Sequence, residues 1–209
     1  CDSVSDDSPA PVGHDGVMTS LTELSVADRY REAAKGFTAR VEETADWDVP
    51  TPVAEWRARD IVGHLTTWLP GMLGDAVPLR PGPSVEDDPV AAWRHLDTQV
   101  QALLDDPTTA ETEVTVAQIG THRLEGLLDQ YFTSDVVFHT WDLARATGQD
   151  DSLDEDFIAG ALAGMSQIKE MIRGSGQFGE QQPVPDDATT QERFFAFIGR
   201  DPRWTPPTP

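Results

Sequence analysis

The chain has 209 residues, 38% of them hydrophobic, and its formal net charge is −22 because 37 acidic residues outnumber 15 basic ones. This length predicts one domain around a single hydrophobic core, with appended ends. The negative charge repels phosphate backbones and anionic lipid surfaces, so it argues against nucleic acid and against a membrane as partners. We interpret the charge as a source of solubility.

The single cysteine and the hydropathy pattern set further limits. Cys1 is the only cysteine, so a disulfide or a zinc site built from cysteines cannot form within this sequence. A catalytic thiol would have to come from outside the chain. The sequence contains neither an apolar run of roughly 18 residues nor a charged segment followed by an apolar one, as in a signal peptide. We therefore expect a cytoplasmic protein.

The first half of the chain predicts a tail and two helices. Residues 1–20 combine Pro, Gly, Ser and Asp with almost no large apolar side chain, which indicates a disordered N-terminal tail. Apolar residues then recur every three or four positions from Ser25 to about Asp46, as in an amphipathic helix. A second helix is expected from Ala58 to Leu73, with Asp60 placed in its first turn to favour the helix dipole. Residues 79–89 have the Pro, Gly and Asp content of a linker.

A third helix is predicted from Pro89 to Leu104, before the helix-breaking sequence DDPTT. A short strand is expected within 113–119. The longest predicted helix then runs from Arg123 to Ala146, and Gly148 follows it as a C-terminal cap.

Two more helices are expected, over 154–172 and 188–198. Four long helices joined by ordinary loops predict an all-α fold, a four-helix bundle with additional C-terminal helices. We assign residues 21–204 to this bundle and 205–209 to a C-terminal tail.

Several ionisable residues occur where the helical pattern predicts a core. At about 100° per residue, the helix over 123–146 has an apolar stripe within about 60° of Asp135, formed by Leu124, Leu128, Tyr131, Phe132 and Phe138. His139 and Asp142 fall on the same side. His64 presents the same anomaly on the second helix, one turn before Trp68. Burying an unpaired carboxylate would cost several kcal/mol, so these groups need a partner.

A divalent cation between the two helices would be such a partner. Asp135 and His139 are four residues apart and could chelate it from one helical turn, while His64 would bind it from the neighbouring helix. Two imidazoles and one carboxylate leave coordination positions open, as in catalytic metal sites. The spacing also arises by chance, and a histidine on an apolar face is more often a core residue. Zinc is the first candidate, and nickel, iron or manganese also suit these ligands.

Two aspartates have alternative interpretations. Asp60 is interpreted as a helix-start residue or as a hydrogen-bond acceptor for His64, in preference to a metal ligand. Asp142 could support the metal ligands, or it could form a salt bridge with Arg145 or Arg123. Asp142 is also the best candidate for a general base.

Three segments resemble a known family: WRARDIVGHL at 56–65, SDVVFHTWDLARATG at 134–148 and ERFFAFIGRDPRW at 192–204. They are similar to actinobacterial metal-binding proteins of the DinB and YfiT-like superfamily, which are related to the N-terminal domain of the mycothiol-dependent maleylpyruvate isomerase. The resemblance implies an up-down-down-up bundle and a metal held by His64, Asp135 and His139. In the isomerase the acidic ligand is a glutamate, where this chain has Asp135. The resemblance also permits a homodimer.

Three hypotheses for the function follow. The first is a metal-dependent thiol transferase or isomerase that acts on a small molecule with mycothiol or a similar low-molecular-weight thiol, because a metal ion lowers the pKa of a bound thiol. The second is a metal-dependent hydrolase of amides or esters, in which the same ion activates water. The third is a protein without enzymatic activity that binds a metal and a small molecule or a partner.

Overall fold

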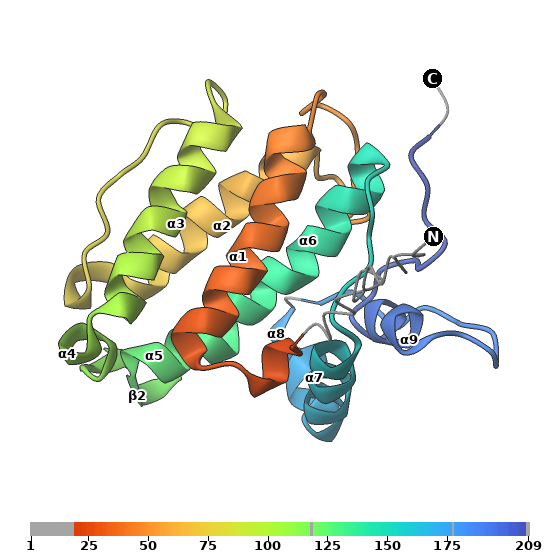
Figure 1. Ribbon diagram of the computed structural model, residues 1–209. Coiled ribbons are helices and arrows are strands. Elements are labelled where there is room, and N and C mark those ends of the chain that lie inside the picture. Colours follow the sequence, from red (N-terminus) through yellow and green to blue (C-terminus); the bar gives the residue numbers. More distant parts are fainter. Residues whose placement is uncertain (1–18, 118, 177, 208–209) are drawn as a thin grey trace, which may run out of the picture.

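The computed structural model describes residues 19–207, apart from 118 and 177. Residues 1–18 of the predicted tail lie outside the described residues. At the end of that predicted tail, the Ser20 hydroxyl donates a hydrogen bond to Asp154 Oδ1 at 3.0 Å and caps the short 3-10 turn η1 (Leu21–Glu23). Four long helices follow, α1 (Val26–Glu43), α2 (Ala58–Leu73), α3 (Pro89–Asp105) and α6 (Ser134–Thr147). Figure 1 shows them as one bundle.

The four helices form the predicted topology. α1 packs against α3 and α6, and α2 packs against the same two helices, so α1 and α2 occupy opposite corners of the bundle. In Figure 1, α1 and α6 run in one direction and α2 and α3 run in the other. Because α2 and α3 are parallel neighbours, the segment that joins them runs back along the length of the bundle. The prediction of an all-α, up-down-down-up bundle with additional C-terminal helices is confirmed.

Local sequence explains where the helices begin. The Ser25 side chain accepts a hydrogen bond from the Asp28 backbone N–H at the start of α1. The Asp88 side chain caps α3 in the same way, and Pro89 occupies the first helical position, which needs no N–H. At the start of α2, Asp60 accepts a hydrogen bond from the Arg57 backbone N–H at 2.7 Å. Asp60 is therefore a helix-start residue.

The helix that carries Asp135 is not a uniform α-helix. It comprises α5 (Leu124–Leu127), a π-helical turn η3 (Leu128–Thr133) and α6. The wider π turn changes the angle per residue, so a projection at a uniform 100° per residue is inaccurate there. Tyr131 is only half-buried, whereas the other apolar residues of the predicted stripe are buried. Single π turns occur often at functional sites, and this one ends directly before α6.

The connections contain short elements that the sequence pattern misses: α4 (Pro107–Ala110) overlaps the expected helix-breaking segment, and a second strand follows. After α4, strand β1 (Glu113–Val116) pairs antiparallel with β2 (Gly120–Arg123). The expected single strand is therefore one arm of a hairpin. The second arm, GTHR, is mostly exposed and has no alternation of apolar residues to reveal it.

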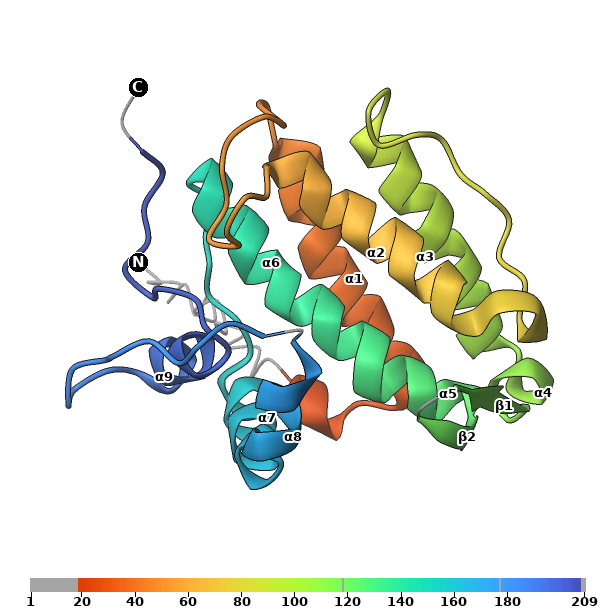
Figure 2. The same cartoon turned by 180° about the vertical axis from the view of Figure 1, so that it is seen from behind.

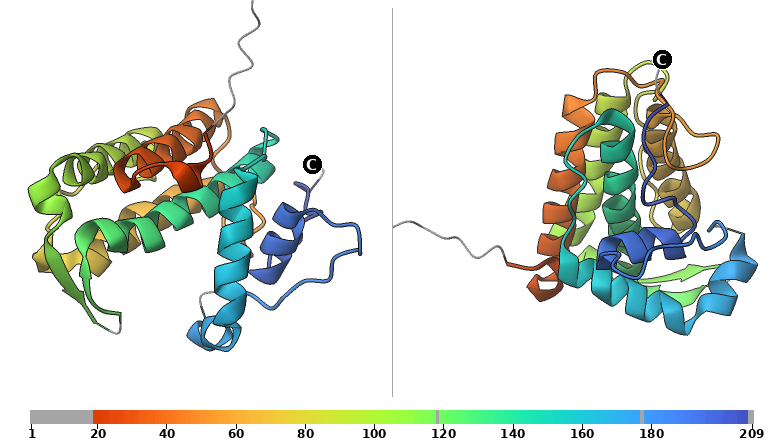
Figure 3. Two further views of the ribbon diagram at one scale, coloured as in Figure 1. Left: turned by 60° about the horizontal axis from the view of Figure 1, so that its bottom comes forward. Right: turned by 90° about the vertical axis from the view of Figure 1, so that its right-hand side faces the viewer.

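The C-terminal helices pack beside the bundle, next to α6 (Figure 3). They are α7 (Glu155–Gln167), α8 (Lys169–Ser175) and α9 (Thr190–Phe197), so the expected helix over 154–172 is divided at Ile168. α9 is joined to α6 by ring contacts, with 3.9 Å between the stacked ring centroids of Trp141 and Phe195. Within the described part of the chain, no helix is both long and apolar enough to cross a membrane.

Candidate metal centre

α2 and α6 lie side by side (Figure 2) and bring the three predicted ligands together. His64, Asp135 and His139 each offer a ligand atom, and these atoms all lie within 4.8 Å of one another. His64 Nε2 is 3.0 Å from Asp135 Oδ2, and His139 Nε2 is 3.5 Å from Asp135 Oδ1. These residues could therefore hold a metal ion in common.

The distances suit a metal ion, and two of the three side chains are partly exposed. Ligand bonds of about 2.0–2.2 Å place neighbouring ligand atoms roughly 3.0–3.5 Å apart, which matches both separations. The side chains of His64 and Asp135 are 31% and 24% exposed, whereas that of His139 is 5% exposed. Solvent and small molecules can thus approach from the side of His64 and Asp135.

Asp135 is held in its anionic form. Burial raises the pKa of Asp135, but the charge of His139 and hydrogen bonds from His64 and Trp68 outweigh burial, so its pKa lies below the ordinary value. Trp68 Nε1–H donates to Asp135 Oδ2 at 2.8 Å. The sequence marked Trp68 only as an apolar residue one turn after His64. Its indole N–H is the feature that could have suggested the contact.

Asp142 supports His139 from the opposite side. Its side chain is fully buried, and Asp142 Oδ2 accepts a hydrogen bond from His139 Nδ1–H at 2.9 Å. Burial raises the pKa of Asp142, but the charges and hydrogen bonds of Arg200 and His139 outweigh burial and lower it. Because Nδ1–H is bound to Asp142, the neutral form of His139 has its lone pair on Nε2, where it can bind a cation.

The cation paired with Asp142 differs from both sequence-based candidates. Arg200 donates to Asp142 from Nε at 3.2 Å and from Nη2 at 3.1 Å. Arg145 instead pairs with Asp151, and Arg123 pairs with Glu111 and Glu125. Arg200 was missed because it lies 58 residues further along the chain, beyond the reach of helical periodicity.

The Trp56 ring packs beside both imidazoles. Its ring centroid is 5.1 Å from that of His64 and 5.7 Å from that of His139, nearly parallel to the latter at 23°. The preceding residue, Glu55, has φ +67, an uncommon conformation for a residue other than glycine. The Trp56 carbonyl accepts a hydrogen bond from the Thr51 N–H at 2.9 Å, which helps to fix this loop. The Trp56 ring restricts access to the imidazoles on one side.

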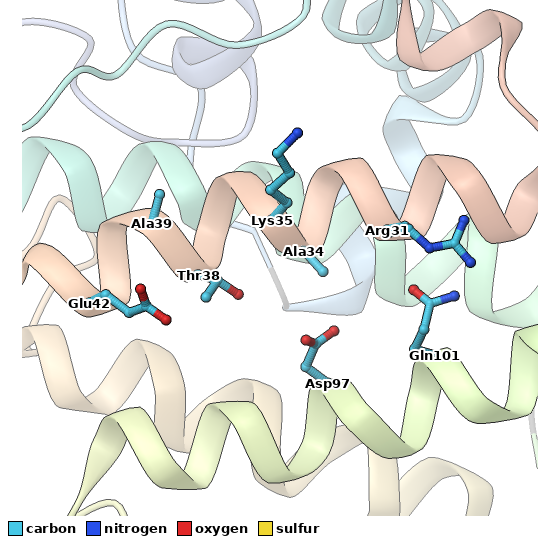
Figure 4. A pocket seen from close by; sticks show the side chains of 8 residues that line it. All are labelled: Arg31, Ala34, Lys35, Thr38, Ala39, Glu42, Asp97 and Gln101. Atoms are coloured by element: carbon cyan, nitrogen blue, oxygen red, sulfur yellow. The ribbon is translucent and has the colours of Figure 1, made fainter.

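A separate groove of about 480 Å³ lies between α1 and α3 (Figure 4). Asp97 reaches into it from α3 and accepts a hydrogen bond from the Tyr30 hydroxyl at 3.0 Å. Burial raises the pKa of Asp97, against the opposing effect of the Tyr30 hydrogen bond. None of the three candidate ligands lines this groove, so we assign it no part in the metal centre.

The fold and the site define an all-α bundle protein with a candidate centre for one metal ion. A scan against models of protein families finds none that matches the chain. Two relatives from Mycobacterium tuberculosis strains, the uncharacterized proteins MT0763 and Rv0738, are each 28% identical over 165 residues, which is 74% of this chain and 85% of theirs.

Among solved structures, the chain is similar to a mutant of the mycothiol-dependent maleylpyruvate isomerase. The TM-score is 0.47 and the sequence identity is 16%, and the match covers 81% of this chain and 80% of that one. The likeness concerns the fold alone.

Proposed function

We propose that this protein is a divalent-metal-dependent enzyme that transfers or isomerises a small substrate with a low-molecular-weight thiol such as mycothiol. The observation that carries the proposal is the convergence of His64, Asp135 and His139 at a partly exposed position between α2 and α6. Two segments of the sequence resemblance contain all three of these residues. The composition also supports an external thiol, since Cys1 is the only cysteine.

Each side chain at the centre has a definite part in this proposal. His64, Asp135 and His139 would hold the ion, and Asp142 would keep His139 Nε2 directed toward it. A bound divalent ion lowers the pKa of a thiol, so that the thiolate nucleophile forms near neutral pH. Trp56 limits water on one side of the imidazoles. We assign Asp142 a positioning role instead of proton abstraction, because its carboxylate is buried and engaged by both His139 and Arg200.

The first experiment tests the metal. Protein purified without added metal is subjected to elemental analysis and then titrated with Zn²⁺ while thermal unfolding is followed. Binding to the folded state alone stabilises it by about 2.7 kcal/mol at 100 times the Kd, so we expect Tm to rise. His64→Ala should abolish this rise. His95→Ala is the matched control, since His95 lies on α3 and contacts the Arg80 carbonyl at 2.9 Å. An unchanged Tm in the parent protein with excess Zn²⁺ would refute the metal centre.

The second experiment tests the thiol. Metal-loaded protein is compared with and without mycothiol, and we expect a further rise in Tm that the metal-free protein does not show. Thiol-dependent turnover of an electrophilic small molecule would then establish the reaction. Hydrolysis of esters or amides without thiol would favour the hydrolase hypothesis instead. Metal binding with neither thiol binding nor turnover would favour a protein without enzymatic activity.

A further inference from the structure

Arg200 follows α9 and reaches a buried carboxylate on α6. Its Nε and Nη2 donate to the two carboxylate oxygens of Asp142 at 3.2 and 3.1 Å. Such a two-point contact fixes the plane of a carboxylate, which a single point charge does not. The Asp142 side chain has 0% exposure and that of Arg200 has 12%, so water competes little for these hydrogen bonds.

The same carboxylate also orients a candidate metal ligand. Asp142 Oδ2 accepts from Arg200 Nη2 and from His139 Nδ1–H, the latter at 2.9 Å. A carboxylate fixed at both oxygens leaves the imidazole one favourable orientation. In that orientation His139 Nε2 lies 3.5 Å from Asp135 Oδ1. Arg200 is thus connected to the metal centre through Asp142 and His139.

The backbone around Arg200 is closely packed. Gly199 has φ +92, which ends α9 and turns the chain back toward α6. A Cβ at Gly199 would lie 2.5 Å from the Gly179 Cα, so the two backbones meet directly. The Arg200 N–H donates to the Phe195 carbonyl at 2.8 Å, and the Phe195 ring stacks on Trp141 of α6. The position of Arg200 therefore depends on the docking of the C-terminal segment against the bundle.

We propose that Arg200 is a positioning residue of the metal centre, through which the C-terminal segment sets the metal affinity of a site built on α2 and α6. The proposal rests on the proposed metal-binding function. It adds that His64, Asp135 and His139 bind metal at full strength only when Arg200 holds Asp142. Removal of comparable hydrogen-bond partners behind a metal-ligating histidine typically weakens metal binding about 10- to 100-fold.

The test is a Co²⁺ titration of the full chain, followed by the visible absorption of the bound ion. We expect Arg200→Ala to bind Co²⁺ about 10- to 100-fold more weakly than the parent protein and to show an altered spectrum. Arg200→Lys keeps the charge but loses the two-point contact, so it should recover only part of the affinity. Arg203→Ala is the matched control, because Arg203 is exposed and lies in the same segment. It should bind like the parent.

A double-mutant cycle shows whether Arg200 acts through Asp142. If it does, Arg200→Ala should have little further effect in an Asp142→Asn background. Independent, additive losses would overturn the proposal. Circular dichroism checks that each variant is folded. If Arg200→Ala does not fold, the Co²⁺ affinity of Arg200→Lys tests the proposal in its place. Parent-like affinity and spectrum in folded Arg200 variants would overturn this inference alone, whereas a parent protein that binds neither Co²⁺ nor Zn²⁺ would overturn the proposed function as well.

Discussion

Trp68 and His64 lie next to the same oxygen of Asp135. The indole N–H donates to Oδ2 at 2.8 Å, and His64 Nε2 is 3.0 Å from that oxygen. The indole hydrogen bond thus directs the carboxylate, and Oδ1 remains on the side of His139. An aromatic residue that the helical pattern places in the core therefore also orients a candidate ligand.

Trp68→Phe should weaken metal binding roughly tenfold, because it removes the donor that orients Asp135 and keeps most of the ring. The measurement is a Zn²⁺ or Co²⁺ titration of the folded variant. Trp93→Phe is a closely matched control, since Trp93 Nε1–H also donates at 2.8 Å, to Thr38 Oγ1, away from the site. It should lower stability and leave metal affinity unchanged. Equal affinity in both variants would show that the indole N–H does not orient the ligand.

Asp97 provides a prediction about pH. Burial raises the pKa of Asp97 in the folded protein above its value in the unfolded chain. Ionisation of Asp97 therefore lowers the stability of the folded state at pH values above the unfolded pKa. This penalty disappears as the carboxyl group becomes protonated at lower pH. Asp97→Asn should therefore raise the free energy of unfolding at pH 7 by about 0.5–1 kcal/mol. The gain should vanish at a pH below both pKa values.

Urea unfolding at the two pH values measures this difference. Asp87→Asn is the control for the loss of one negative charge, since Asp87 is exposed. A variant at Asp97 that is less stable than the parent at pH 7 would mean that the Tyr30 hydrogen bond requires the charged carboxylate.

At the scale of single residues, the sequence could place side chains that share a helical turn. Asp135, His139 and Asp142 lie within eight residues, so the period of the helix alone assigns them to one side. Adding His64 required a second helix with the same anomaly, a polar group among apolar ones. Arg200 and Trp56 lie in irregular segments, where no period relates sequence position to direction. Their contacts depend on tertiary packing.

At the scale of elements, long amphipathic helices were predictable to within a few residues. α1, α2 and α3 each begin at a capping side chain or a proline, and their apolar residues recur at the helical period. The π turn η3 was not predictable, because it changes the number of residues per turn without changing the composition. The hairpin arm β2 was missed for a related reason. Its pairing with β1 is a contact between different segments, and its polar sequence has no apolar alternation that would predict a strand.

A methyl group at Gly199 would clash with the backbone of Gly179 in the C-terminal segment. Gly199→Ala would require both a strained φ and a shift of the Gly179 backbone, so we expect a loss of stability of about 1–3 kcal/mol. Thermal unfolding measures it. Gly164→Ala in α7 is the control, since a Cβ there meets nothing within 4 Å and alanine favours a helix. It should be neutral or stabilising. A Gly199→Ala variant as stable as Gly164→Ala would show that the two glycine backbones can separate freely.

At the scale of the whole molecule, the net charge of −22 causes repulsion among acidic residues, which no single contact shows. Many arginines are already engaged with carboxylates, such as Arg59 with Asp48 and Glu86, and Arg94 with Glu42. With 37 acidic residues and 15 basic ones, most acidic residues have no basic residue with which to pair one-to-one. Exposed ion pairs contribute little each, so the repulsion should be the larger effect of charge on the stability of the compact state.

Salt should therefore stabilise this protein. Raising NaCl from about 0.1 M to about 1 M shortens the Debye length from about 10 Å to about 3 Å, which screens repulsion among the carboxylates. A gain of about 1 kcal/mol would raise Tm by roughly 2–4 °C for a chain of this size. KCl should act equally if screening is the cause, and the metal-free His64→Ala variant should respond like the parent, because the effect does not involve the metal centre. A Tm that falls with salt would mean that ion pairs such as Arg59 with Asp48 stabilise the fold more than the excess negative charge destabilises it.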